Sequence, residues 1–364
     1  MDKLKIIRIL VAAFSFMCIA IICGLETRQA HQFLFILGVL CLFGLLLKNI
    51  WLTLFLWWTC YLYISFKFEW GWGYLSNIFY GCVLYYLVKV AFKKEHINFY
   101  INIILWVLVI NLLYGCVQAL GYDFIYSGEE GKGLLPKGFM GNSAVTASFI
   151  VLCLPLLLTR GSLLARLGSV GLFLPLYILH SSLNFLAGIM GLLFVLWFKL
   201  SRKIWVALCV LLICFMAVFL AYKDMPGIER FDVWKLILSD AKLHPITGWG
   251  LDSFKAMNSK KNYIYVKDMS GDDKMGNIQH WDNPHNLYIS LLYEFGIITL
   301  ILLGGYIRQL CLWFKNAYKE PNTIALAGFI LMFFVISMGH FPAFLARIMC
   351  FSIPIFALYE LQVT

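Results

Sequence analysis

Residues 281–299, WDNPHNLYISLLYEFGIIT, show the pattern that the rest of this chain repeats: a polar start that turns apolar within a few residues, here with His285 at the change. Asn283 and Pro284 are residue types that favour the start of a helix, which predicts His285 in the first turn of a long apolar helix. A helix N-terminus disfavours an imidazolium and attracts anions, so His285 would be a proton acceptor beside an anion site. The alternative is that His285 only ends a loop.

The composition is that of an integral membrane protein. Of the 364 residues, 62% are hydrophobic and 13% are charged, whereas soluble domains have roughly 45–50% apolar and 25% charged residues. The 12 Trp and 19 Tyr are typical of aromatic belts at membrane surfaces. The formal net charge of +10 does not indicate nucleic acid, because the basic residues lie mostly between hydrophobic runs. The 11 Cys form no disulfide framework and no zinc-binding pattern.

About twelve apolar windows approach the length that crosses a bilayer. They cover residues 6–24, 32–47, 50–66, 74–92, 98–119, 142–158, 162–179, 182–198, 204–221, 286–306, 322–339 and 342–359. With the N-terminus in the cytoplasm, most Lys and Arg lie in inside loops, as the positive-inside rule requires. We therefore expect an all-α polytopic membrane protein of about 12 transmembrane helices, with both termini in the cytoplasm.

Two segments on the outer side are long. Residues 121–141 contain GEEGKG and are expected to form a flexible loop. The only large polar stretch divides the chain into helices 1–9 over 1–221, an outer loop over 222–284 and helices 10–12 over 285–364. In that loop, RFDVWKLILSDAKLHP has apolar residues at helical spacing, which predicts an amphipathic helix on the outer membrane surface that ends before Pro245.

Four charged side chains on the outer side are candidates for chemistry. Arg230 begins the amphipathic helix, where the dipole does not favour a cation, so it suits the capture of phosphate or, alternatively, of lipid headgroups. Glu294, inside an apolar helix, is either a functional carboxylate or part of a structural hydrogen bond. His340 and Arg347 flank the last outer turn, where Arg347 either snorkels outward or lines a cavity.

Metal and nucleotide chemistry have no support in the sequence. His244, His280 and Asp282 could be imagined as ligands beside His285, but their spacing fits no standard metal site. No Walker loop, dinucleotide-binding glycine pattern, GxSxG or HExxH motif is present.

The segment HNLYISLLYEFGIIT resembles the motif of the O-antigen ligase superfamily, in which a His and a small polar residue precede a Gly about three turns later; here these are His285, Asn286 and Gly296. RFDVWKLILSDAKLHPITGWGLDSF resembles that family's large loop, and PKGFMGNSAVTASF is similar to its Gly–aromatic–Asn segment. The resemblance implies a C-type glycosyltransferase fold with one large periplasmic loop, in the bacterial inner membrane.

The resemblance also implies an activity: an inverting, metal-independent glycosyltransferase that moves a glycan from undecaprenyl-diphosphate to a periplasmic acceptor, without any cofactor. The acceptor is lipid A–core for a ligase, a glycan for a polymerase and a protein for an O-oligosaccharyltransferase. By position, His285 and Arg230 are the catalytic residues. The further candidates for substrate binding are Lys137, Asn142, Asn286, Glu294, His340 and Arg347. A transporter or flippase is the alternative, although no pair of broken helices suggests inverted repeats.

Two positions depart from the family pattern. Family members often carry a Ser-Arg pair in the eighth span that binds the phosphates of the carrier, whereas SSLNFLAG at 181–188 has no Arg. Lys137 or Arg347 would have to replace that cation. Trp234 stands where some family loops have Leu, four residues after the Arg.

Overall fold

The computed structural model describes residues 81, 84–122, 136–140, 142–160, 162–179, 182–207, 228–250, 253–254, 284–339 and 346–364. These residues form helices and turns, and none of them lies in a strand, so the all-α prediction is confirmed over this part of the chain. The chain divides into two compact units. The loop unit comprises Met1–Val90, Glu229–Pro284 and Tyr288–Cys311, and the bundle unit comprises Ala91–Ile228, His285–Leu287 and Leu312–Thr364.

Two helical stretches in the described ranges are long and apolar enough to cross a membrane, Lys94–Ala119 and Leu287–Ala317. Shorter apolar helices follow the predicted windows at Ser143–Leu158, Leu183–Trp197, Pro321–Ile336 and Phe351–Val363. The windows 6–24, 32–47 and 50–66, and most of 74–92 and 204–221, lie outside the described residues. The count of twelve spans, the boundaries at 221 and 284 and the position of the termini stay predictions.

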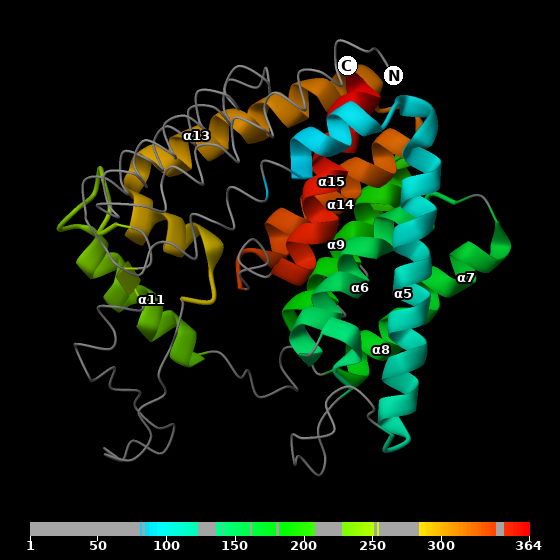
Figure 1. Ribbon diagram of the computed structural model, residues 1–364, viewed down its shortest axis with the longest axis horizontal. Helices are drawn as coiled ribbons and strands as arrows, with labels where there is room; N and C mark the ends of the chain where they lie inside the picture. Colours follow the sequence, from blue (N-terminus) through cyan, green and yellow to red (C-terminus); the bar gives the residue numbers. More distant parts are fainter. Residues whose placement is uncertain are drawn as a thin grey trace, which may run out of the picture. The chain divides into compact units, whose positions relative to one another are not determined.

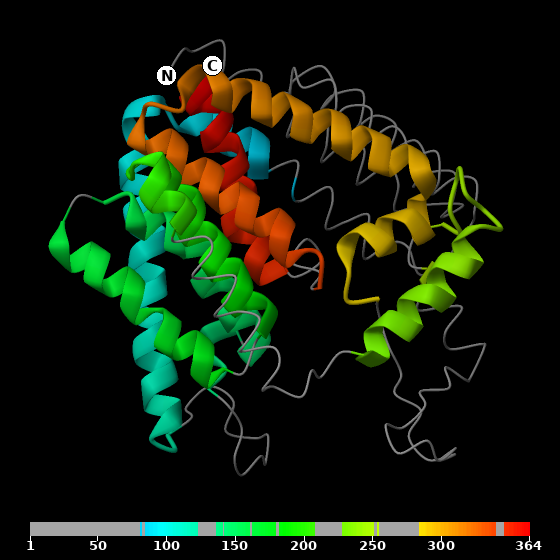
Figure 2. The same cartoon turned by 180° about the vertical axis from the view of Figure 1, so that it is seen from behind.

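The bundle unit is built around α6 (Ser143–Leu158), whose residues from Val145 to Leu156 are all buried. α6 packs against α9 (Ser182–Trp197) and α14 (Pro321–Ile336), which also contact each other. α15 (Ala346–Val363) packs against α14, and Figures 1 and 2 show these helices side by side. A Cβ at Gly328 of α14 would lie 2.6 Å from the Cβ of Pro155, so α14 and α6 touch at a small residue, as is common between membrane helices.

Helix α5 (Ile97–Ala119) has apolar side chains on both faces. One face buries Ile101, Ile104 and Leu108, whereas Trp106 and Leu113 are 67% and 62% exposed. A helix that is apolar all round and exposed on one side suits contact with lipid rather than with water. The charge pattern agrees, because α5 contains no charged residue, and the nearest ones on its N-terminal side come before its first turn.

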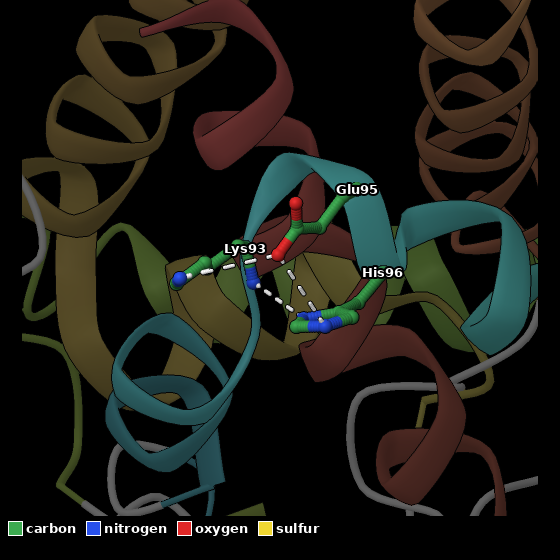
Figure 3. A network of polar contacts seen from close by, with 3 residues as sticks. All are labelled: Lys93, Glu95 and His96. Carbon is green, nitrogen blue, oxygen red and sulfur yellow. Dashed lines mark hydrogen bonds and ion pairs between the residues drawn. The ribbon is translucent and has the colours of Figure 1, made fainter. Parts of the chain in front are cut away.

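Those charged residues lie around η1 (Lys94–His96), directly before α5. Figure 3 shows three of them: the Lys93 backbone N–H donates to His96 Nδ1 at 3.1 Å, and Glu95 lies within 3.9 Å of Lys93 Nζ and 3.7 Å of His96 Nε2. All three side chains are exposed, so these contacts stabilise the fold little. They lie directly before the first turn of α5.

The predicted window 162–179 is divided between two helices, and the expectation that it crosses the membrane as one span stays a prediction. These residues form two short helices, α7 (Leu163–Gly171) and α8 (Phe173–Ile178), with Leu172 between them. Pro175 has no backbone N–H to donate to the carbonyl oxygen of Gly171, which weakens a continuous helix at this point. The Leu172 N–H still donates to the Gly168 carbonyl oxygen at 3.0 Å, so the two helices follow each other directly.

The loop unit contains α11 (Ile228–Ala241) and most of α13 (Leu287–Ala317). α11 covers the stretch in which the sequence predicts a helix, and it ends before Pro245 as expected. Ile237 and Ala241 of α11 form a buried cluster with Phe254 and with Tyr293 of α13. α13 continues to Ala317, eleven residues beyond the predicted window that ends at 306.

Candidate functional site

His285 lies in a bend before α13, not in the first turn of that helix. Its φ is +51°, a left-handed conformation that residues other than Gly adopt rarely and that a right-handed helix excludes. The predicted helical position is therefore wrong. Asn283, the predicted cap, lies outside the described residues. The His285 side chain is half-buried, and its left-handed backbone conformation needs support from neighbouring residues.

The residues after His285 are tied to the end of α14. The Asn286 side-chain Nδ2 donates to the Met338 carbonyl oxygen at 2.8 Å, and the Leu287 backbone N–H donates to the Ser337 carbonyl oxygen at 2.9 Å. Asn286 is buried. These bonds use the amide of the first residue of α13, so the predicted anion site at this helix start has one donor fewer. Asn286, predicted to bind substrate, contributes a structural bond beside His285.

The residue before His285 is tied to α11. The Trp234 indole Nε1–H donates to the Pro284 carbonyl oxygen at 2.8 Å. Arg230 lies in the first turn of α11, one helical turn before Trp234. Trp234 was predicted to differ from the family pattern and was given no role in the site. Its unusual identity was the signal from which a role could have been inferred. The role of Arg230 stays a prediction.

α13 is broken at Gly296, where φ is 74° and ψ is −177°, and the helix bends in both views (Figures 1 and 2). In an unbroken helix the Ile297 N–H would donate to the Tyr293 carbonyl. Here the Ile297 N–H donates to the Pro245 carbonyl oxygen at 2.9 Å, and the Tyr293 carbonyl accepts from the Trp249 N–H at 2.8 Å. The loop after α11 therefore pairs with the backbone groups that the break exposes.

Two glycines make this interlock between loop and helix feasible. The backbone of Gly296 is in a region that is essentially restricted to glycine, and a Cβ there would overlap the Ile246 carbonyl oxygen. Gly248 has φ +68°, and its Cβ would lie 2.5 Å from the carbonyl carbon of Glu294. The Glu294 carbonyl oxygen accepts from the Gly250 N–H at 2.9 Å. In the sequence, Gly248 belongs to the stretch that resembles the family's large loop and Gly296 to the motif after His285. In the structure, the two glycines lie at the same contact.

The predicted Gly–aromatic–Asn segment forms η2 (Gly138–Met140) and is held by α5. Gln118 Oε1 accepts from the N–H groups of Lys137 and Gly138 at 2.9 and 2.7 Å, and Asn111 Oδ1 accepts from the Phe139 N–H at 2.8 Å. The segment 136–140 is thus ordered, whereas the prediction included it in a flexible loop. Residues 123–135 of that loop lie outside the described part.

Asn142 caps the start of α6, because its Oδ1 accepts from the N–H groups of Ala144 at 2.8 Å and Val145 at 3.3 Å. The carbonyl group of this predicted substrate-binding residue therefore has a structural role. Whether Asn142 and Lys137 contact a substrate stays a prediction.

In the segment where family members carry a Ser-Arg pair, this chain buries Asn184. Ser148 Oγ donates to Asn184 Oδ1 at 3.2 Å, and Asn184 Nδ2 donates to the Ala144 carbonyl oxygen at 3.3 Å. The sequence analysis missed this residue, although a lone amide in an apolar run is a usable signal. Asn184 ties α9 to α6 and supplies no charge.

The remaining residues predicted to bind substrate are Glu294, His340 and Arg347. Glu294 is 1% exposed on α13, and Arg347 is the second residue of α15. His340 lies outside the described residues, as do His280 and Asp282. Within the described ranges no three His, Cys, Asp or Glu side chains gather as metal ligands do, and the ring of His244 packs against Trp249 at 4.1 Å.

Residues 145–304 match the model of a protein family described as O-Antigen ligase. The match extends from the first turn of α6 through α11 and His285 to a point beyond the break in α13. A search of curated proteins finds no match.

Proposed function

We propose that this chain, which belongs to the O-antigen ligase/polymerase superfamily, is an inverting glycosyltransferase that moves a glycan from undecaprenyl-diphosphate to lipid A–core on the periplasmic side of the membrane. Members of the family are glycosyltransferase-like enzymes of the inner membrane, with a lipid-linked glycan and an acceptor as partners. The observation that carries the proposal is the family match over 145–304, which includes His285 and Arg230.

His285 acts as the base. The acceptor hydroxyl oxygen forms the new bond to C1 of the donor sugar, and the C1–O bond to the diphosphate breaks on the opposite face, which inverts the anomeric centre. The hydroxyl proton passes to the imidazole. A positioned base contributes typically 10²–10⁴-fold to the rate. Diphosphate leaves readily, so the reaction requires no general acid.

Arg230 stabilises the charge that grows on the leaving diphosphate. A guanidinium binds phosphate through two parallel N–H groups, and such preorganised charge is most effective where charge develops. Arg230 lies in the first turn of α11, and the Trp234 indole of the same helix donates to the Pro284 carbonyl oxygen at 2.8 Å.

The test uses the purified full chain in lipid nanodiscs with an undecaprenyl-diphosphate-linked glycan and lipid A–core. Covalent glycan on lipid A–core supports the ligase. Longer glycans on the carrier alone would instead identify a polymerase, glycosylated protein an O-oligosaccharyltransferase, and movement of the donor across the bilayer without new covalent product a transporter.

His285→Ala should lower transfer at least about 100-fold, because the base is removed, and the fold of the variant is checked by its monodispersity. His96→Ala, at the exposed start of α5, is the matched control and should keep wild-type activity. Wild-type product from His285→Ala would exclude the assigned base.

Arg230→Lys keeps the charge and removes the two-pronged donor, so we expect about a tenfold or greater loss of transfer. An unchanged rate would exclude bidentate capture of the diphosphate by this residue.

A further inference from the structure

We infer that Trp234 is a positioning residue for His285: its indole N–H holds the peptide that joins Pro284 to His285. The inference rests on the proposed function for its effect on transfer, whereas the geometric part can be measured separately.

The hydrogen bond from Trp234 restricts ψ of Pro284, which is the freely rotating backbone angle directly before the peptide bond to His285. The pyrrolidine ring of Pro284 restricts its φ, so the orientation of its carbonyl depends on ψ alone. The Trp234 Nε1–H donates to that carbonyl oxygen at 2.8 Å. Because the peptide bond is planar, the direction of the Pro284 carbonyl also determines the direction of the His285 N–H. This one hydrogen bond thus fixes the orientation of the peptide plane that precedes the Cα atom of His285.

His285 needs such support because its φ is +51°. A left-handed conformation in a residue other than Gly persists only where its surroundings hold it. On the C-terminal side, the bonds of Asn286 and Leu287 to the end of α14 provide this. On the N-terminal side, the bond from Trp234 has the same role.

Trp234 can hold that peptide because α11 is itself anchored. Ile237 and Ala241 of α11 pack in the buried cluster with Phe254 and Tyr293. The Trp249 Nε1–H donates to the Asp240 carbonyl oxygen of α11 at 3.0 Å. Trp205 is the matched control, because its indole Nε1–H also donates to a main-chain carbonyl, that of Leu193 at 3.0 Å, and this bond is not part of the anchoring of α11.

The experiment compares Trp234→Phe with Trp205→Phe in the full chain. Two quantities are measured: kcat and KM for transfer, and the rate at which diethyl pyrocarbonate modifies His285, followed on its own peptide by mass spectrometry. We expect Trp234→Phe to lower kcat about three- to tenfold with KM within about twofold, and to change the His285 modification rate. Trp205→Phe should leave both quantities at wild-type values.

A second variant keeps the test decisive if Trp234→Phe fails to fold. Benzothienylalanine at position 234 keeps the shape of the indole ring and lacks only its N–H. A wild-type kcat and a wild-type His285 modification rate in either folded variant would overturn the inference. If the modification rate changes but the wild-type chain transfers no glycan, the proposed function fails and the positioning role stands.

Discussion

Helices α5 and α13 are both long and apolar, yet they hold their neighbouring loops in different ways. α5 is continuous, and it holds the segment 137–140 with the side chains of Asn111 and Gln118. α13 is interrupted, and it holds the loop 245–250 with its own backbone carbonyl and N–H groups. A side-chain attachment depends on which residue is present, whereas a backbone attachment depends on whether the chain can adopt the required φ and ψ. The two regions should therefore respond to different substitutions.

The largest effect is expected for Gly296→Ala, which tests the backbone attachment directly. A Cβ at this position meets the Ile246 carbonyl oxygen and forces a conformation that is essentially restricted to glycine. We expect a loss of about 3 kcal/mol or more in stability, seen as a lower midpoint of thermal unfolding in detergent and a smaller monodisperse fraction.

Gly304→Ala is the matched control on the same helix, because nothing lies within 4 Å of a Cβ there. It should be neutral or stabilising by up to about 1 kcal/mol. Equal unfolding midpoints for the two variants would show that the break in α13 does not depend on glycine.

Gly248→Ala probes the loop side of the same attachment, and we expect a smaller loss of about 2 kcal/mol. The new Cβ would lie 2.5 Å from the Glu294 carbonyl carbon, and φ is +68°. Gly121→Ala separates the two causes, because Gly121 has φ +90° with nothing within 4 Å. If both variants unfold at the same temperature, the contact with α13 contributes nothing and only the backbone conformation matters.

Gln118→Ala tests the side-chain attachment of α5, with an expected loss of about 1 kcal/mol. The substitution leaves the N–H groups of Lys137 and Gly138 without their acceptor. Gln118→Glu keeps an acceptor oxygen at the same reach and should restore most of the stability in the same thermal assay. Rescue by Glu distinguishes an attachment through Oε1 from a loss of packing, and its failure would count against the attachment.

Much of the helical arrangement was predictable from hydropathy. The window 98–119 became α5 at Ile97–Ala119, and the window 142–158 became α6 at Ser143–Leu158. Apolar side chains extend along whole helices, so the mean hydropathy of a window of sequence predicts where such a helix lies. Single backbone groups do not appear in such averages. Hydropathy therefore missed the division at Leu172 and the break at Gly296.

The position of His285 beside a helix start was predictable, and its backbone conformation was not. The change from polar to apolar residues located His285 beside a helix start, and the family motif identified Gly296. The left-handed backbone of His285 could not be predicted, because it depends on partners far away in the sequence, Trp234 on one side and Ser337 and Met338 on the other.

By itself, the sequence determined where the long apolar helices lie and which stretch resembles the superfamily motif, because hydrophobicity and residue identity are local properties. Only the tertiary structure decided that α13 is interrupted, that the loop after α11 pairs with the interruption, and that His285 stands before the helix. These features depend on where each backbone N–H and carbonyl finds a partner, and in this chain those partners are up to 52 residues away.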